Sequence, residues 1–282
     1  MVEIIKKIKE MQKRAESFRR MGKRIGLVPT MGFLHEGHLS LIRNIRNDCD
    51  VLVVSIFVNP TQFGPGEDFK EYPRDFERDK KLINENGGDI IFAPDTEEIY
   101  GKNYLTFVKV RELSEIMCGR SRPTHFEGVT TIVAKLFNIV KPHIAIFGQK
   151  DAQQAVIIKK MVNDLNFDVE IKISPIVREK SGIAMSSRNT YLNNNEKEQA
   201  LALYKSLLIA REEISKGERK SEGIKEKMKN CFEKYPDVKL EYIEIRDFDT
   251  LKDLNHLKGN VLIAVAAKIG CARLIDNIIV NV

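Results

Sequence analysis

The sequence lacks tryptophan altogether, and aromatic residues make up only 7% of its 282 residues. Proteins that bind single-stranded nucleic acid commonly stack the bases on aromatic side chains, so this scarcity argues against such a platform. The net charge of +6 comes from basic and acidic residues mixed along the same segments, as in residues 216–229, and not from one basic tract. We therefore expect no nucleic-acid partner.

Cysteines and long apolar runs are also scarce. The four cysteines are scattered, and no two of them form a CxxC pair. This pattern is typical of reduced thiols in a cytosolic protein. No run approaches ~18 consecutive apolar residues, and the first residues carry no apolar core of signal-peptide length. We therefore expect a cytoplasmic protein without a membrane partner.

Apolar, β-branched runs alternate with helical patterns through the first part of the chain. We predict strands over residues 24–29, 51–58, 90–93, 144–147 and 169–177, and helices over residues 39–47, 73–86, 128–140 and 153–166. Several strands are apolar almost throughout, as strands buried on both faces of a parallel sheet are. The alternation predicts an α/β fold with a Rossmann-like, doubly wound parallel sheet, which binds its ligands beyond the carboxyl ends of the strands.

The pattern changes after about residue 187. Helices are predicted over residues 195–216 and 222–235, and strands over residues 240–246, 261–267 and 274–280. Helices grouped before strands indicate a second, smaller α+β domain. We expect residues 1–177 to form the Rossmann-like ligand-binding domain and residues 178–282 to form the C-terminal domain.

The segment after the first predicted strand carries two histidines between glycines. It reads Gly32-Phe33-Leu34-His35-Glu36-Gly37-His38. A Rossmann-type fold binds phosphate at this place, although the segment matches neither GxGxxG nor GxxxxGK[ST]. Two imidazoles three residues apart can donate hydrogen bonds to a phosphate transition state. The same pair could instead ligate zinc, although it lacks the HExxH spacing, or simply cap the helix. From the residues alone, all three interpretations stay open.

A second polar segment lies far downstream, at Met185-Ser186-Ser187-Arg188. Two hydroxyls followed by a cation suit the binding of a triphosphate, and the alternative is an ordinary polar linker between domains. Together the two segments resemble the HIGH and KMSKS signatures of the nucleotidylyltransferase superfamily, which includes the class I aminoacyl-tRNA synthetases. Their order, at the start and the end of a β–α alternation, strengthens the resemblance.

Two neutral amides, Asn59 and Gln62, follow the second predicted strand directly. Such amides can donate to a carboxylate and accept from a hydroxyl, which suits a hydroxy acid as substrate. A purely structural turn is the competing interpretation.

Two basic segments lie beside other predicted helices. Lys150 follows a strand and can reach triphosphate oxygens as a point charge, and Gln154 lies one helical turn further along. Arg122 and His125 precede another helix, and surface decoration is the alternative for this pair.

The blocks together resemble the pantoate–β-alanine ligase family. The resemblance covers essentially the whole chain, from PTMG-x-LHEGH through FVNPTQF, RPTHFEGV, FG-x-KDAQQ and VRE to MSSRN-x-YL. It implies that pantoate attacks the α-phosphate of ATP to give pantoyl adenylate and pyrophosphate, and that β-alanine then attacks the acyl carbon to give pantothenate and AMP. It also implies Mg²⁺ bound with ATP and a homodimer. Because an adenylate hydrolyses where water enters, we expect the C-terminal domain and the hinge at residues 181–188 to act as a lid.

The resemblance further implies which residues form the site. ATP would contact Met31, Gly32, Phe33, Leu34, His35, Glu36, Gly37, His38, Gly148, Gln149, Lys150, Asp151, Val177, Met185, Ser186, Ser187 and Arg188. The catalytic residues would be His38 as proton donor, His35, Lys150 and Arg188. Pantoate and β-alanine would contact Gln62, Gln154, Asn59, Arg122 and His125.

Two details of this assignment concern charge. Gln149 stands where the family commonly has Glu, and we expect this difference to leave the chemistry unchanged. Asp75 and Asp79 are candidates for an indirect contact with Mg²⁺, and the sequence shows no dedicated metal cage of carboxylates.

Two other hypotheses compete with a ligase. An adenylyltransferase that leaves AMP on a phosphorylated acceptor would call for more Arg or Lys near the second strand, where this chain has neutral amides. An RNA-binding module related to a synthetase would call for a basic helix, which the sequence does not contain.

Overall fold

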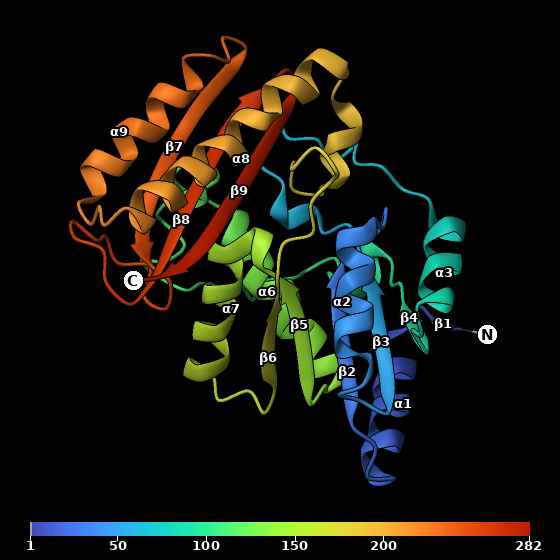
Figure 1. The fold of residues 1–282 in the computed structure, drawn as a ribbon. Coiled ribbons are helices and arrows are strands. Elements are labelled where there is room, and N and C mark those ends of the chain that lie inside the picture. Colours follow the sequence, from blue (N-terminus) through green and yellow to red (C-terminus); the bar gives the residue numbers. More distant parts are fainter. Residues whose placement is uncertain (1) are drawn as a thin grey trace. The chain divides into compact units, whose positions relative to one another are not determined.

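A six-stranded, wholly parallel sheet organises the first part of the chain in the computed structural model, which describes residues 2–282 (Figure 1). Its strands are β1 (Glu3–Ile5), β2 (Ile25–Thr30), β3 (Val51–Ile56), β4 (Ile90–Phe92), β5 (Ile144–Gly148) and β6 (Glu170–Ser174). They lie in the order β1-β4-β3-β2-β5-β6. The chain winds outward from β2 in both directions, so the topological switch point falls between β2 and β5. Ligands of doubly wound sheets bind at such a point, beyond the carboxyl ends of the strands.

Helices cover both faces of this sheet. The helices of this part of the chain are α1 (Ile8–Arg20), α2 (Glu36–Arg46), α3 (Phe76–Glu85), α4 (Thr96–Ile99), α5 (Cys118–Ser121), α6 (His125–Val140) and α7 (Ala152–Asp164). Helices α2 and α3 lie over one face, while α1 and α6 pack together over the other (Figure 1). With both faces covered, a strand such as β3 is buried along nearly its whole length, which explains its unbroken apolar sequence.

The last part of the chain forms a three-stranded antiparallel sheet with two helices. Its elements are α8 (Asn194–Ser215), α9 (Ser221–Phe232), β7 (Val238–Asp247), β8 (Asn260–Ile269) and β9 (Ala272–Asn281). Both helices pack on one face of the sheet, and this interface contains a separate apolar core. The central strand β8 contributes Ile263 and Val265 to that core, and both are fully buried.

The chain divides into two compact units. One holds Met1–Gly148 and Ile157–Pro175, and the other holds Gln149–Val156 and Ile176–Val282. The second unit therefore includes a short segment, with the 3-10 helix η2 (Gln149–Asp151) and the start of α7, that precedes the predicted boundary after residue 177 in the sequence. The predicted use of the C-terminal domain as a lid stays a prediction.

The predicted fold class is confirmed, and the differences concern the ends of elements. Helix α2 begins at Glu36 and α6 at His125, each three residues before the predicted start. Helix α3 begins at Phe76, because the side chain of Asp75 accepts a hydrogen bond from the backbone N–H of Arg78 and so caps the helix there. Strand β1 and helix α1 were not predicted, since β1 is only three residues long and α1 is rich in charged residues.

Among the helices of residues 2–282, none combines the length and the apolarity that crossing a membrane requires.

Candidate active site

The loop after β2 is held by one buried carboxylate. Asp79 of α3 is 1% exposed, and its two oxygens accept hydrogen bonds from the backbone N–H groups of Phe33 and Leu34, each at 2.7 Å. Both Gly32 and Phe33 have positive φ angles, of 79° and 48°. A side chain at Gly32 would be strained, and its Cβ would lie 3.0 Å from Asp79 Oδ2. The loop therefore has a defined shape before any ligand binds.

Asp79 was predicted as an indirect Mg²⁺ contact, together with Asp75. Burial raises the pKa of the Asp79 carboxyl, and the hydrogen bonds from Leu34 and Phe33 oppose that rise. The structure thus gives Asp79 the role of holding the loop and Asp75 the role of capping α3. Any contact of either residue with Mg²⁺ stays a prediction.

The two histidines lie side by side where α2 begins. His35 is the N-cap residue of α2 and His38 lies in the first turn, and their ring centroids are 4.0 Å apart. His38 Nδ1 accepts a hydrogen bond from the backbone N–H of His35 at 3.3 Å. A neutral His38 ring therefore carries its proton on Nε2. The neighbouring Glu36, predicted to contact ATP, is exposed and forms an ion pair with Arg43.

The segment after β3 begins beside this loop, because Thr30 of β2 pairs with Ile56 of β3. Asn59 is fully buried, and its Oδ1 accepts hydrogen bonds from Thr61 and from the Tyr100 hydroxyl. Its Nδ2 donates to the Gly128 carbonyl and to Gln62 Oε1, both at 3.0 Å.

These bonds fix which way the Gln62 amide is turned. A carbonyl can only accept, so the Asn59 atom that faces Gly128 must be the nitrogen, and the Gln62 atom that faces it must be the oxygen. Gln62 is therefore held with its Nε2 as the remaining polar group. Within residues 2–282, no acceptor takes a hydrogen bond from this nitrogen.

Arg122 and His125 bind the backbone of the same turn. Arg122 donates to the Gln62 carbonyl at 3.1 Å, and His125 Nδ1 lies 2.9 Å from that oxygen. Arg122 also forms a two-point ion pair with Glu67, with contacts of 2.7 and 2.6 Å. Burial alone would raise the pKa of Glu67, but the hydrogen bonds and charge of Arg122 outweigh it and lower the pKa below its ordinary 4.5.

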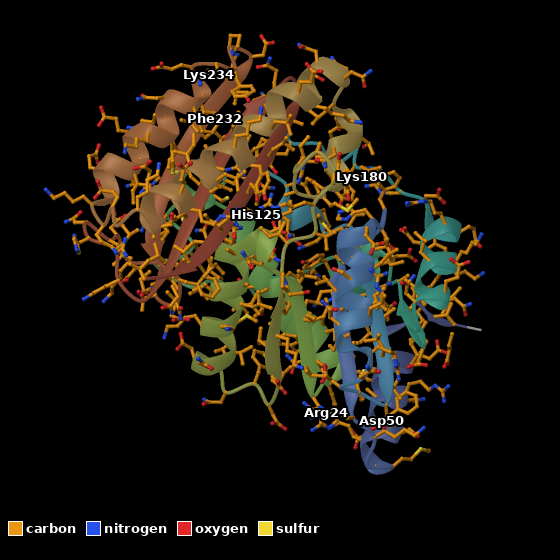
Figure 2. All side chains as sticks on the ribbon, in the orientation of Figure 1. Arg24, Asp50, His125, Lys180, Phe232 and Lys234 are labelled. Atoms are coloured by element: carbon orange, nitrogen blue, oxygen red, sulfur yellow. The ribbon has the colours of Figure 1, made fainter. Side chains whose placement is uncertain are left out.

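His125 stands at the start of α6, while Arg24 and Asp50 lie at the other end of the sheet, where β2 and β3 begin (Figure 2). The predicted residues of the first unit accordingly gather where its strands end. They form two groups. One is the histidine loop, residues 32–38, and the other is the cluster of Asn59, Gln62, Arg122 and His125.

In the second unit, η2 carries Gln149, Lys150 and Asp151. The Asn277 side chain of β9 donates to the backbone carbonyls of Gln149 and Lys150 at 2.9 and 3.0 Å. Lys150 Nζ lies 3.6 Å from the carboxylate of the adjacent Asp151. Gln154 lies in the first turn of α7 and is partly exposed.

The remaining predicted ATP contacts lie on a short hairpin and the turn that follows it. The Met185 N–H donates to the Val177 carbonyl at 3.0 Å, and Arg178 pairs with Ala184 in an antiparallel β-bridge. Ser186 then caps the 3-10 helix η3 (Ser187–Tyr191), as its hydroxyl accepts from the Arg188 N–H at 3.3 Å.

A profile of the pantoate-beta-alanine ligase family matches residues 3–279. The chain belongs to this ligase family.

Individual relatives agree over the full length. A pantothenate synthetase of Thermotoga petrophila is 56% identical, with 99% of this chain and 100% of the relative covered. The crystal structure of pantothenate synthetase from Thermus thermophilus is 40% identical and superposes with a TM-score of 0.93, covering 98% of this chain and 99% of that one.

A third relative carries ligands. The pantoate-beta-alanine ligase of Francisella tularensis, whose crystal structure is described as a complex with beta-gamma ATP and beta-alanine, is 34% identical, and the alignment covers 99% of this chain and 97% of that one. Its TM-score is 0.79. The chain is thus an enzyme, a pantoate–β-alanine ligase, and the adenylyltransferase hypothesis is set aside.

Some residues around the candidate site were not predicted from the sequence. Glu67 and Tyr100 belong to the Gln62 cluster, and Asp276 and Asn277 contact the predicted ATP-binding segments of the second unit. The last two could have been noticed in the sequence, since they place two successive polar residues in the middle of a largely apolar strand. Glu67 lies in a polar loop, and no sequence pattern pointed to it.

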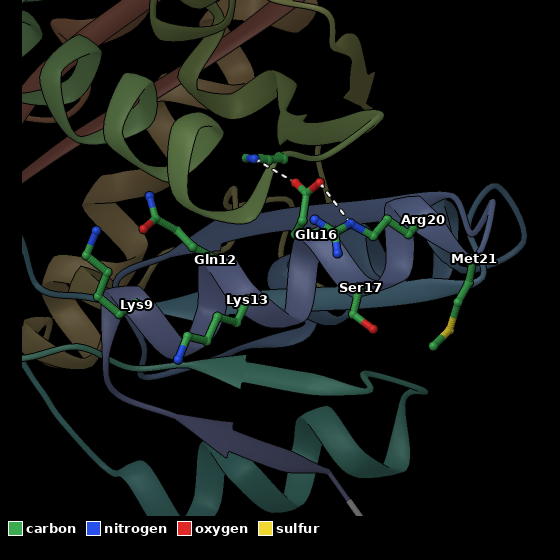
Figure 3. A pocket seen from close by; sticks show the side chains of 8 residues that line it. Lys9, Gln12, Lys13, Glu16, Ser17, Arg20 and Met21 are labelled. Atoms are coloured by element: carbon green, nitrogen blue, oxygen red, sulfur yellow. Dashed lines mark hydrogen bonds and ion pairs between the residues drawn. The ribbon is translucent and has the colours of Figure 1, made fainter.

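Elsewhere in the ligase, a metal-binding cluster or a surface groove could also bind a ligand. Within residues 2–282, no group of three or more His, Cys, Asp or Glu side chains is arranged to hold a metal ion. A surface groove runs along α1 and contains none of the predicted site residues (Figure 3). It is lined by Lys9, Gln12, Lys13, Glu16, Ser17, Arg20, Met21 and Lys141.

Proposed function

We propose that this ligase joins pantoate to β-alanine at the expense of ATP, through a pantoyl-adenylate intermediate. In the first step a carboxylate oxygen of pantoate bonds to the α-phosphorus of ATP, and the bond to the β-phosphate oxygen breaks to release pyrophosphate. In the second step the amine of β-alanine bonds to the acyl carbon, AMP leaves with the carboxylate oxygen, and the nitrogen loses a proton. Activation is needed because a free carboxylate is a poor acyl donor toward an amine.

The histidine loop carries this proposal. It follows β2 at the switch point of the sheet, and it ends in the N-terminus of α2, where backbone N–H groups and the helix dipole favour an anion. His38 has its Nδ1 engaged by the His35 N–H, so its Nε2–H is the ring donor suited to the charge that develops on a phosphate. The ATP complex of the Francisella tularensis relative supports ATP as the nucleotide.

Gln62 is proposed to bind pantoate. Its oxygen is used by Asn59, which leaves the two N–H donors of Nε2 for a carboxylate or hydroxyl oxygen. Asn59, which is fully buried, would then act on pantoate only by orienting Gln62. Arg122 and His125 are proposed to support the same turn, and Gln154 to contribute a second amide.

In the second unit, Lys150 and Arg188 are proposed to bind the phosphates, with Gln149, Asp151 and Val177 at the nucleotide. Mg²⁺ would arrive with ATP. The carboxylates predicted near it, Asp75 and Asp79, already accept backbone hydrogen bonds, so the phosphate oxygens and water would supply most of its ligands.

A homodimer and a cytoplasmic location are also proposed. They rest on the family resemblance and on cysteines that are all free thiols, as expected in a reducing compartment. Sedimentation equilibrium of the purified ligase tests the dimer, and a monomer at micromolar concentration would contradict it.

The deciding experiment is exchange of labelled pyrophosphate into ATP. We expect exchange that requires pantoate and Mg²⁺ and proceeds without β-alanine, because the first step is then complete and reversible. Exchange that needs β-alanine would rule out a free adenylate. Release of AMP as a product, measured in the full reaction, separates the ligase from transfer of AMP to an acceptor.

A further inference from the structure

Strand β9 carries two successive polar residues, Asp276 and Asn277, each 3% exposed, in a sequence that is otherwise largely apolar. Successive side chains of a strand point to opposite faces of the sheet. Asp276 shares its face with Leu274 and Ile278, which pack in the core beneath α8 and α9, and Asn277 lies on the other face. Buried polar groups of this kind are costly unless they are fully hydrogen-bonded. Their partners therefore show what they do.

On one face, Asp276 binds Arg178. The guanidinium donates to both carboxylate oxygens, at 2.6 and 2.9 Å, and lies 4.0 Å from the ring centroid of Tyr204 of α8. Arg178 also donates to the Gly182 carbonyl at 3.0 Å. It thereby closes the hairpin whose second arm leads directly to the turn at Met185 and Ser186.

On the other face, Asn277 binds the Lys150 turn. Its Nδ2 donates to the carbonyls of Gln149 and Lys150, and its Oδ1 accepts from Gln149 Nε2 at 3.1 Å. Two carbonyls can only accept, so the orientation of this amide is fixed, and all its major hydrogen-bonding groups are used. The backbone that carries Lys150 is thus hydrogen-bonded to strand β9, and Arg178 is hydrogen-bonded to the same strand.

We propose that Asp276 and Asn277 are positioning residues, which set the Lys150 turn and the hairpin before residues 186–188 at one fixed spacing for binding ATP. The inference rests on the proposed function, because that function assigns both segments to ATP. Both residues are buried, so their proposed role is to hold these segments and not to contact the nucleotide themselves. Each acts by holding a loop segment in place beforehand, so that less conformational freedom is lost when the phosphates bind.

The test compares Asn277→Ala with Asn281→Ala. Asn281 lies on the same strand and on the same face, and its side chain donates to Asn260, away from both segments. ATP affinity is measured by calorimetry, and KM is measured for ATP and for pantoate. We expect Asn277→Ala to weaken ATP about tenfold or more, with the KM for pantoate nearly unchanged, because it removes two hydrogen bonds to the turn. Asn281→Ala should leave ATP affinity unchanged.

A second variant keeps the shape of the side chain and changes only what it presents to the two carbonyls. Asn277→Asp has nearly the same shape but places an acceptor against the two carbonyls, so it should weaken ATP at least as much as Asn277→Ala. Normal ATP affinity in a folded Asn277→Asp protein would overturn the proposal, as would equal losses for ATP and pantoate in either variant.

The same experiments distinguish the two proposals. If the wild-type protein binds ATP but shows no pantoate-dependent pyrophosphate exchange, the adenylate mechanism fails, and the affinity comparison still decides the role of Asn277.

Discussion

The Asn59 side chain donates from Nδ2 to Gln62 Oε1 at 3.0 Å, and this bond turns the Gln62 amide so that its N–H groups remain for a ligand. Asn59 can hold this orientation because its own amide is fixed by Gly128, Thr61 and Tyr100. The two neutral amides after β3, which look alike in sequence, therefore have different roles. Asn59 orients the Gln62 amide, and Gln62 is proposed to bind pantoate.

Replacing Gln62 is expected to affect the binding of pantoate far more than the binding of ATP. Gln62→Ala should raise the KM for pantoate about tenfold or more and leave the KM for ATP nearly unchanged, since it removes a donor to pantoate. Gln62→Glu should be worse than the alanine variant, because a carboxylate would face the pantoate carboxylate. Steady-state kinetics with each substrate varied in turn measures both effects.

A matched control for this prediction is Gln12→Ala, on α1 in the groove of Figure 3. It should change neither KM. Equal losses of pantoate and ATP binding in Gln62→Ala would remove Gln62 from the acid pocket.

His38 is expected to matter in the transition state more than in folding. His38→Ala should lose about 2–4 kcal/mol of transition-state stabilisation in kcat/KM, as loss of a donor to developing charge does. His38 lies in the first turn of α2, so the fold should survive. His256→Ala, at an exposed histidine of the second unit, is the control for handling and assay. A folded His38→Ala protein with near-normal turnover would contradict the assignment.

Periodicity was sufficient to predict the fold, because the physics that forms these elements is local. Apolar runs such as residues 51–56 and the helical spacing of residues 39–45 are visible without knowing any partner. Short or highly charged elements were missed. Strand β1 becomes a strand only by pairing with β4, and pairs such as Ile4↔Ile91 lie 87 residues apart in the sequence.

Motifs predicted the residues of the candidate site, but not the contacts made by the buried polar residues around it. From the sequence, Asp79 was a candidate for an indirect contact with Mg²⁺. Its hydrogen bonds from the backbone of Phe33 and Leu34 could not be predicted, because they require α3 to lie beside the loop. The contact of Asn277 with the Lys150 turn links residues more than 120 positions apart, which no local pattern encodes. Sequence therefore indicates the chemistry of a segment, and tertiary contacts decide which residues hold it in place.

Gly128 is expected to be intolerant of even a methyl group. A Cβ there would lie 2.5 Å from the Thr61 carbonyl oxygen and 2.9 Å from the Gln62 nitrogen, so α6 or the turn would have to move. Gly128→Ala should lower stability by about 1–3 kcal/mol and raise the KM for pantoate. Denaturant unfolding and pantoate kinetics measure the two effects.

The control for Gly128 is Gly223→Ala on α9, where a Cβ would meet nothing closer than 3.5 Å. There the change should be neutral or stabilising by about 0.5–1 kcal/mol, because alanine favours a helix. If Gly128→Ala were equally neutral or stabilising, α6 could not lie as close to the Gln62 turn as it does in this structure.

The ion pair of Glu67 with Arg122 should give stability a defined dependence on pH. The pKa of Glu67 is lower in the folded protein than its ordinary 4.5, so the pair stabilises the fold above that value. The contribution is lost as the pH falls through the lowered pKa, because the folded state must then take up the proton. Glu67→Gln should therefore be less stable than the wild type near neutral pH, and the difference in Tm should shrink in acid.

Thermal unfolding of both proteins from about pH 6 to about pH 3 measures this difference, in which the titration of all other carboxyls cancels. Glu97→Gln on α4 is the matched control, since Glu97 forms no ion pair within residues 2–282 and its Tm difference should be small at every pH. A gap between wild type and Glu67→Gln that stayed constant into acid would mean that Arg122 does not hold Glu67 in its charged form. In that case the loop that carries Glu67 would need another anchor, and the support of the Gln62 turn by Arg122 would have to be reconsidered with it.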